Sequence, residues 1–259
     1  MNKFFSLLAV LVYASLKVSA QGVIVNSNPT MNDRFSKRSG NLRLSTTLLK
    51  IGRIKTNATK SDTIRIYNDG IRNMSLLLGK LPSHLDVHLG TAALAPKTES
   101  WIAITYNASL KNDFGFVIDR IEVVTNDSVQ PKKIISVSAN IQEYFSPLSA
   151  EDSLTIQKAI WSVTSYDYGK IKQGAKPSFV FAITNEGKRD VIIRKIKSNC
   201  TCMKVSASKD TIPPGGNSQV SLEFDSANKL GKDSRKVNVF LNDPARPEVV
   251  LEMKGEIEK

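Results

Sequence analysis

The sequence predicts an all-β protein made of two tandem β-sandwich domains. Three observations favour this fold class: short segments that alternate apolar and polar residues, turn-forming residues between them, and an internal repeat. The chain has 259 residues, of which 41% are hydrophobic and 23% are charged. This composition is typical of a folded globular protein and unlike that of a disordered chain.

The strands are clearest in the second half of the chain. Three segments place an apolar residue at every second position: Phe179, Phe181 and Ile183; Val220, Leu222 and Phe224; Val249, Leu251 and Met253. A period of two with one apolar face is typical of a half-buried antiparallel strand. Turn signals stand between them at Asn185–Gly187, Pro213–Gly216 and Asn242–Pro244. About seven short strands in about 100 residues predict an immunoglobulin-like β-sandwich.

An internal repeat predicts a second copy of this unit. With a shift of about 117 residues, Ile51–Lys55 aligns with Tyr168–Lys172, and Ile66–Gly70 aligns with Ile183–Gly187. At a shift of about 116, Asn126 and Asp127 fall on Asn242 and Asp243. Because the matching blocks keep their order, we interpret the chain as a tandem duplication. The predicted domains are residues 42–142 and 156–259, joined by a linker at 143–155.

The N-terminus predicts export. Lys3 is followed by the apolar run Phe4–Leu16 and by the small residues of Val18–Ala20, an order typical of a cleaved signal peptide over residues 1–20. Residues 21–41 are expected to form a flexible lead-in. No second apolar stretch is long enough to span a bilayer, so we expect a protein of the periplasm or the cell exterior without a transmembrane segment.

The positive charge is concentrated in the first half. The net charge is +12, and removal of Lys3 and Lys17 with the signal peptide leaves 36 − 2 = 34 basic and 24 acidic residues, or +10. Residues 21–142 hold 16 basic and 9 acidic residues, and residues 143–259 hold 18 and 15. Export excludes nucleic acid as the expected partner and leaves membrane surfaces, glycans and acidic proteins. The simpler interpretation is a solvated face, because the charges are dispersed among strand-like segments. An anionic surface would meet the first half.

The second copy resembles a known family. The segments that carry the resemblance are Tyr168–Ile171 with Gly174, Phe181–Gly187, Ser198–Cys202, Ile212–Gly215 and Asn242–Pro244. Their order over roughly residues 164–257 resembles the domain of unknown function 1573 family. The resemblance implies exported bacterial proteins with an immunoglobulin-like fold akin to the major-sperm-protein type, and no established activity.

Cys200 and Cys202 are the first candidate site. Two residues apart on a strand, their side chains would leave the same face. Three interpretations stay open: a short disulfide, which export would allow, a thiolate pair for a soft metal ion, and a pair of inert small residues. Zinc would need about four ligands, of which two cysteines supply half.

His84, Asp86 and His88 are the second candidate site. They alternate with Leu85, Val87 and Leu89, so a strand would place all three on one outward face that could hold a metal. The simpler interpretation is a polar outer face of a half-buried strand. The repeat aligns this segment with the two cysteines.

No motif in the sequence points to catalysis or to a cofactor. Neither a Gly-x-Ser-x-Gly elbow nor a glycine-rich phosphate loop is present. We therefore expect a non-catalytic binding or scaffold protein of the bacterial envelope that contacts protein or glycan through sandwich edges or loops. The alternatives are a pilus-type periplasmic chaperone, and metal or redox handling at Cys200 and Cys202.

Overall fold

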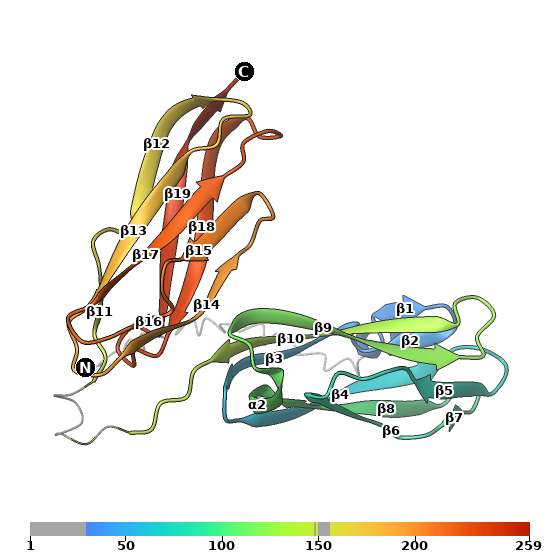
Figure 1. Cartoon of the computed structure of the whole chain (residues 1–259). Coiled ribbons are helices and arrows are strands. Elements are labelled where there is room, and N and C mark those ends of the chain that lie inside the picture. The colour runs from blue at the N-terminus through green and yellow to red at the C-terminus, as the bar shows by residue number, and fades with distance from the viewer. Residues whose placement is uncertain (1–29, 148, 150–155) are drawn as a thin grey trace, which may run out of the picture.

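The computed structural model describes residues 30–147, 149 and 156–259. Each half of the chain forms a β-sandwich (Figure 1), so the predicted all-β fold with two tandem immunoglobulin-like domains is confirmed. The predicted signal peptide and most of the predicted linker lie outside the described residues. No helix in the described ranges is long and apolar enough to cross a membrane.

Two five-stranded sheets form the first domain. One sheet has the order β1-β2-β4-β8-β6 and the other the order β3-β10-β9-β5-β7. The strands are β1 (Lys37–Ser39), β2 (Leu42–Leu44), β3 (Leu48–Lys55), β4 (Thr59–Asn68), β5 (Met74–Leu78), β6 (Leu85–Leu89), β7 (Ala93–Leu94), β8 (Glu99–Asn107), β9 (Gly115–Thr125) and β10 (Lys132–Gln142). Two four-residue helices, α1 (Met31–Arg34) and α2 (Ala108–Lys111), complete the domain.

The second domain has a four-stranded sheet, β11-β13-β17-β15, and a five-stranded sheet, β12-β19-β18-β14-β16. The strands are β11 (Ala159–Trp161), β12 (Ser165–Lys172), β13 (Ser178–Asn185), β14 (Val191–Ser198), β15 (Met203–Ala207), β16 (Thr211–Ile212), β17 (Asn217–Phe224), β18 (Gly231–Leu241) and β19 (Glu248–Glu258). The predicted alternation holds, since Phe181, Ile183, Val220, Leu222 and Phe224 all point into the core.

The lead-in predicted for residues 21–41 is too long. The Thr30 side chain caps α1 in a capping box with Asp33, and Phe35 is buried against Tyr67 with ring centroids 5.6 Å apart. Strand β1 then pairs with β2. The first domain therefore includes residues 30–41, because a single buried aromatic residue in an otherwise polar segment fixes this part of the chain to the sandwich.

A parallel strand pair explains the first repeated block. In each domain the first long strand runs parallel to the last one, β3 with β10 and β12 with β19, and both ladders contain a register shift. The shift lies at Gly52 in the first domain and at Gly169 in the second, with φ of 74° and 68°. A bulge with positive φ favours glycine, which accounts for the glycine in both Ile51–Lys55 and Tyr168–Lys172.

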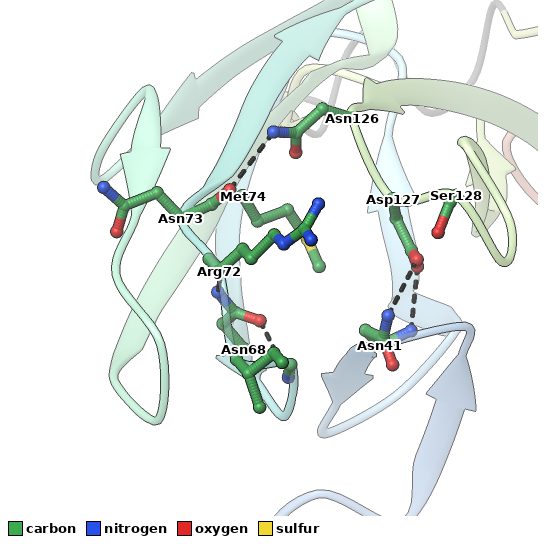
Figure 2. Close-up of a pocket in the computed structure, with 10 residues that line it drawn as sticks. Asn41, Asn68, Arg72, Asn73, Met74, Asn126, Asp127 and Ser128 are labelled. Carbon is green, nitrogen blue, oxygen red and sulfur yellow. Dashed lines mark hydrogen bonds between the residues drawn. The ribbon is translucent and has the colours of Figure 1, made fainter.

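Paired asparagines explain the second repeated block. Asn68 Nδ2 donates to the carbonyls of Arg72 and Leu94, and its Oδ1 accepts from Gly70 N (Figure 2). Asn185 makes the equivalent three hydrogen bonds, to the carbonyls of Arg189 and Ile212 and from the amide of Gly187. Each asparagine satisfies buried backbone groups at a loop, the role that such polar side chains have inside proteins.

The third repeated block, Asn126–Asp127 and Asn242–Asp243, also makes equivalent hydrogen bonds in the two domains. Asn126 accepts from Ser75 N and donates to Asn73 O, and Asn242 accepts from Ile192 N and donates to Asp190 O. The following aspartates, Asp127 and Asp243, accept from the backbone of Asn41 and Ala159 respectively. The repeated sequence blocks therefore mark the same hydrogen-bonded joints in both domains.

Contacts between the domains join the end of α2 to strands β14 and β18. Asp113 Oδ1 lies 2.7 Å from Lys195 Nζ and 2.9 Å from Lys197 Nζ. Phe114 stacks on Phe240 with ring centroids 6.0 Å apart. The two lysines lower the pKa of Asp113, against burial that alone would raise it. These contacts hold one corner of the first domain against the second.

Candidate functional site

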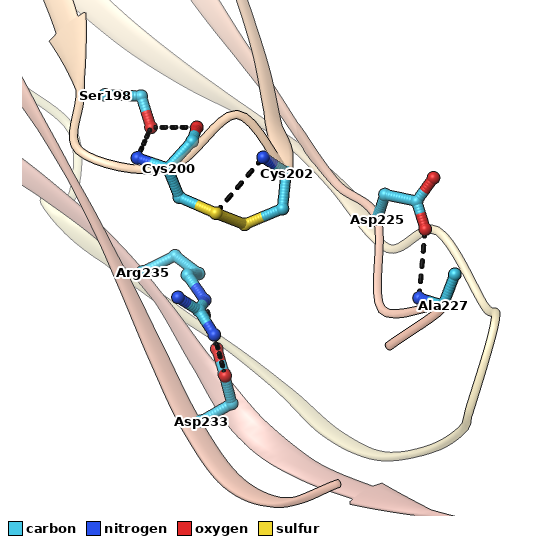
Figure 3. Close-up of a disulfide and its surroundings, with 7 residues drawn as sticks. All are labelled: Ser198, Cys200, Cys202, Asp225, Ala227, Asp233 and Arg235. Carbon is cyan, nitrogen blue, oxygen red and sulfur yellow. Dashed lines mark hydrogen bonds and ion pairs between the residues drawn. A yellow bond between two sulfur atoms is a disulfide. The ribbon is translucent and has the colours of Figure 1, made fainter. Parts of the chain in front are cut away.

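The cysteine pair lies in a turn. Cys200 and Cys202 fall between β14 and β15, and their sulfur atoms form a disulfide across a Cα–Cα distance of 5.1 Å (Figure 3). The turn is closed by Ser198, whose Oγ accepts from Cys200 N and donates to Cys200 O. The expectation of two side chains on one face of a strand is therefore corrected, because β15 begins only at Met203.

The disulfide is half-buried: one side packs against the core of the second domain and the other borders a cavity. A cavity of about 310 Å³ is lined by Cys200–Cys202, Asp225 and Ala227–Lys229. Arg235 and Asp233 form an ion pair on β18 beside it (Figure 3). The backbone N–H of Cys202 donates to Cys200 Sγ at 3.1 Å. A donor in this position stabilises the negative charge that develops on Cys200 Sγ as the S–S bond is cleaved.

The histidine site predicted on one outward face is not formed. His84 precedes β6, lies in a turn, and is buried with its Nε2 atom 3.0 Å from Asp119 Oδ2. Asp86 and His88 do point outward and form an exposed pair at 3.0 Å. The alternation stops at Leu85, where the strand begins, so His84 does not follow it. Among the described residues no group of three His, Cys, Asp or Glu side chains is arranged to hold a metal.

His84 instead belongs to a buried polar cluster of the first domain. Lys111 Nζ donates to Asp119 Oδ1 at 2.5 Å, and the Tyr106 hydroxyl donates to Oδ2 at 3.3 Å. Burial alone would raise the pKa of Asp119, but the hydrogen bond from Lys111 and the close contact with His84 lower it below its ordinary value. The cluster lies beneath α2, and none of its side chains lines either of the cavities at the two ends of the domain.

A second cavity lies at the end of the first domain, where Asn41, Asn68, Asn126 and Asp127 meet. It has a volume of about 380 Å³, and the Arg72 side chain extends into it (Figure 2). The amides of the three asparagines are engaged in hydrogen bonds to the protein. Asp127 binds Lys133 Nζ at 2.5 Å, and both side chains are fully buried. The polar groups here therefore serve the fold.

The outer face of sheet β3-β10-β9-β5 differs from all these sites because it is both apolar and cationic. The exposed residues that point outward from it are Leu48, Lys50, Arg53, Lys55, Leu77, Phe116, Ile118, Arg120, Lys132 and Ile134. We name this set the apolar–basic face. Phe116 is 65% exposed and Ile118 is 54% exposed, although large apolar side chains are usually buried.

Most cations of the apolar–basic face are unpaired. Lys132 contacts Glu122 at 3.3 Å, whereas Lys50, Arg53, Lys55 and Arg120 make no ion pair within the described part of the chain. The sequence analysis missed this face. The signal that could have revealed it is Phe116-Val117-Ile118, three consecutive apolar residues that break the alternation expected of a half-buried strand.

Comparison with known proteins identifies a family for one of the two domains. Residues 159–257 match the family described as Protein of unknown function (DUF1573). The resemblance predicted from the sequence is thus confirmed for the second domain. The match does not extend to the first domain, which shares the fold. No curated protein matches this chain.

Several solved structures are similar. A protein of unknown function from Porphyromonas gingivalis has a TM-score of 0.60 at 18% identity, covering 84% of this chain and 100% of its own. The ASH / PapD-like domain of human CEP192 has a TM-score of 0.34 at 13% identity, covering 45% of this chain and 94% of its own. The YadV chaperone has a TM-score of 0.30 at 14% identity, covering 83% of this chain and 99% of its own. The first of these likenesses shows the two-domain fold.

Proposed function

We propose that the chain is an exported, non-catalytic binding or scaffold protein of the bacterial envelope, and that the apolar–basic face of its first domain binds an acidic partner. The observation that carries this proposal is the exposure of Phe116 and Ile118 on a sheet face whose cations are mostly unpaired. The partner classes are an acidic envelope protein or an anionic glycan.

Apolar side chains supply the energy for such a contact. Burial of Phe116 and Ile118 by a partner would contribute about 1.5–3 kcal/mol each. The unpaired cations select for acidic partners and speed association, since complementary charge acts mainly on specificity and on-rate. An aromatic anchor with an arginine nearby is also the composition enriched at interface centres.

The second domain offers a matched contrast. Its exposed large apolar residues, Val163, Val180, Leu230 and Val250, are smaller, and it has no exposed phenylalanine or tryptophan among the described residues. A partner that is bound through apolar contacts should therefore have a higher affinity for the first domain than for the second.

Sedimentation with isolated cell envelopes tests the proposal. The full chain is expected to sediment with them, less so as salt rises and screens exposed charges. The double variant Ile118→Ser with Arg120→Glu should lower the bound fraction about tenfold, because one apolar anchor and one cation are lost. Its matched control is Val250→Ser with Lys254→Glu on the equivalent sheet of the second domain, which should bind like the wild type. Equal binding by both variants would overturn the proposal.

Thiol–disulfide exchange is the second candidate, favoured by the N–H donor on Cys200 Sγ and by the open cavity beside it. A thiolate of a partner dithiol would attack Cys202 Sγ, the S–S bond would break, and Cys200 would leave as the thiolate. The partner's second thiol would then attack the mixed disulfide. The partner ends oxidised, and the cysteine pair ends reduced.

Glutathione tests this second candidate. With oxidised glutathione, mass spectrometry should detect a mixed disulfide at Cys202 in the Cys200→Ser variant, formed as the Cys202 thiolate attacks the glutathione disulfide and releases one reduced glutathione. In the wild type, an excess of reduced glutathione should give two free thiols within minutes. A wild-type disulfide that stays intact for hours under these conditions would rule out exchange.

A further inference from the structure

The opposite sheet of the first domain carries an exposed tryptophan. Trp101 lies on strand β8, between β4 and the edge strand β6, and its side chain is on the outer face of sheet β1-β2-β4-β8-β6, where it is 45% exposed. Its cross-strand neighbour on β4 is Arg65. A tryptophan in this place adds nothing to the core, because Ile102 and Ile104 of the same strand fill the inner face.

The indole ring of Trp101 packs against Gly90. A Cβ atom added to Gly90 would lie 2.8 Å from Trp101 Cε2 and 2.9 Å from Nε1. The ring therefore occupies the space that any side chain at position 90 would fill. The amide of Gly90 also donates to Trp101 O at 2.9 Å, which holds the two backbones together. The ring is thus backed by the protein on one side and open to solvent on the other.

Short polar side chains continue the same face beyond the ring. The next cross-strand row is Thr63, Ala103 and His88, and the row after it is Ser61, Thr105 and Asp86. His88 and Asp86 form an exposed pair at 3.0 Å, and Ser61 Oγ lies 2.7 Å from Thr105 Oγ1. Because Ala103 is small, the surface next to the indole ring is recessed. Hydroxyl, imidazole and carboxylate groups border this recess.

A shallow groove runs along this face beside Trp101. It has a volume of about 290 Å³ and is lined by Thr63, Arg65, Glu99, Ser100 and Trp101. Glu99 is held by Arg34, whose Nη2 lies 2.6 Å from Oε2. The Arg65 guanidinium makes no hydrogen bond or ion pair within the described ranges, so a cation borders the ring with its donors free.

We propose that Trp101 is the stacking platform of a binding site for an acidic polysaccharide. The apolar C–H face of a pyranose ring packs on the open face of the indole, whose π-system is electron-rich there. Thr63 and the His88–Asp86 pair bind sugar hydroxyls, and Arg65 binds a carboxylate of the polymer in its fork. The site lies on the sheet opposite the apolar–basic face and does not depend on it.

Indole N–H signals in NMR spectra test the proposal on the intact protein. The chain has two tryptophans, and Trp161 is buried in the second domain, so its signal is an internal control. A panel of hexasaccharides serves as probe: oligogalacturonate and hyaluronan as acidic members, cellohexaose and chitohexaose as neutral ones. We expect a saturable shift of the Trp101 signal with at least one acidic member, and no shift of the Trp161 signal.

Variants separate stacking from charge. Trp101→Ala should abolish binding in calorimetry, and Trp101→Phe should retain part of it. Arg65→Gln should weaken the acidic member about tenfold, through the loss of a charge-assisted contact. The control variant Val180→Ser, which changes an exposed apolar residue of the second domain, should leave the affinity unchanged. Absence of any Trp101 shift across the panel at 10 mM sugar, or equal affinity in Trp101→Ala, would overturn the proposal.

Discussion

The two domains have the same joints but are stabilised by different interactions. Asn68 and Asn185 make the same three hydrogen bonds, and Gly52 and Gly169 occupy the same bulge. The main buried cluster of the first domain contains one aromatic residue, Tyr106, with Phe35 and Tyr67 buried outside it, whereas that of the second contains Trp161, Phe181 and Phe224. The joints define the fold, and the packing between them is free to differ.

Buried charge is the sharper difference. The first domain encloses Lys133 with Asp127, and Lys111 and His84 with Asp119. At the place of Lys133 the second domain has Val249, and the buried carboxylate of Asp243 is held by backbone N–H groups. The domain that exposes the candidate binding faces therefore also depends on internal ion pairs.

Loss of the buried lysine should have the largest effect. Lys133→Met leaves Asp127 buried without its cation and should destabilise the first domain by about 3–5 kcal/mol. The matched variant Val249→Met leaves no buried charge unpaired and should cost less, about 1–2 kcal/mol, through the larger side chain at a partly buried position. Urea unfolding followed by hydrogen exchange in each domain measures both. Adding Asp127→Asn to Lys133→Met should restore part of the loss, and equal stability of the two single variants would contradict the comparison.

The next largest difference between the two domains should be their stability at low pH. Lys133 and backbone N–H groups lower the pKa of Asp127 despite its burial, Lys111 and His84 do so for Asp119, and Arg43 and Lys97 lower that of Asp69. A lowered carboxylate pKa contributes stability above the unfolded value of 3.8, and this contribution is lost as pH falls below it. In a pH titration by NMR, the first domain should therefore unfold at a higher pH than the second. The reverse order would show that its ion pairs do not govern acid stability.

The equivalent asparagines should give equal, smaller effects. Asn68→Ala and Asn185→Ala each leave two buried carbonyls and one amide without a partner. Each variant should cost about 1–3 kcal/mol in its own domain. Thermal unfolding with a probe in each domain would show whether the losses match. A loss in one domain alone would mean that the joints are equivalent in geometry but not in energy.

The disulfide should contribute least. It closes a ring of three residues, for which the chain-entropy model gives about 1.5 kcal/mol. Replacement of both cysteines by serine should lower the stability of the second domain by no more than this. A larger loss in urea unfolding would assign the pair a structural role and weaken the case for exchange.

The fold could be predicted from the sequence because its signals are local. Alternation at Phe179–Ile183 and turn residues at Pro213–Gly216 are set by neighbouring residues, and the repeat doubles each signal. The burial of Phe35 was not predicted because it is a single apolar residue in a polar segment. Its burial depends on contact with Tyr67, which is remote in sequence.

The sites were less predictable because they depend on where strands end and on cross-strand neighbours. His84 was assigned to the outward face by alternation, but the strand starts one residue later. The apolar–basic face brings together four strands, and Trp101 is notable only with Gly90 beneath it. No sequence window contains these juxtapositions.

Hydroxyl-radical footprinting of the full chain, with and without isolated cell envelopes, shows whether the apolar–basic face is the surface that binds. Phe116, Ile118, Leu77 and Ile134 are exposed and oxidisable, so each reports on cover of this face. Their oxidation should fall together on addition of envelopes, while that of Val180 and Leu230 in the second domain should be unchanged. Protection of the second domain alone, or of neither domain, would contradict the proposal.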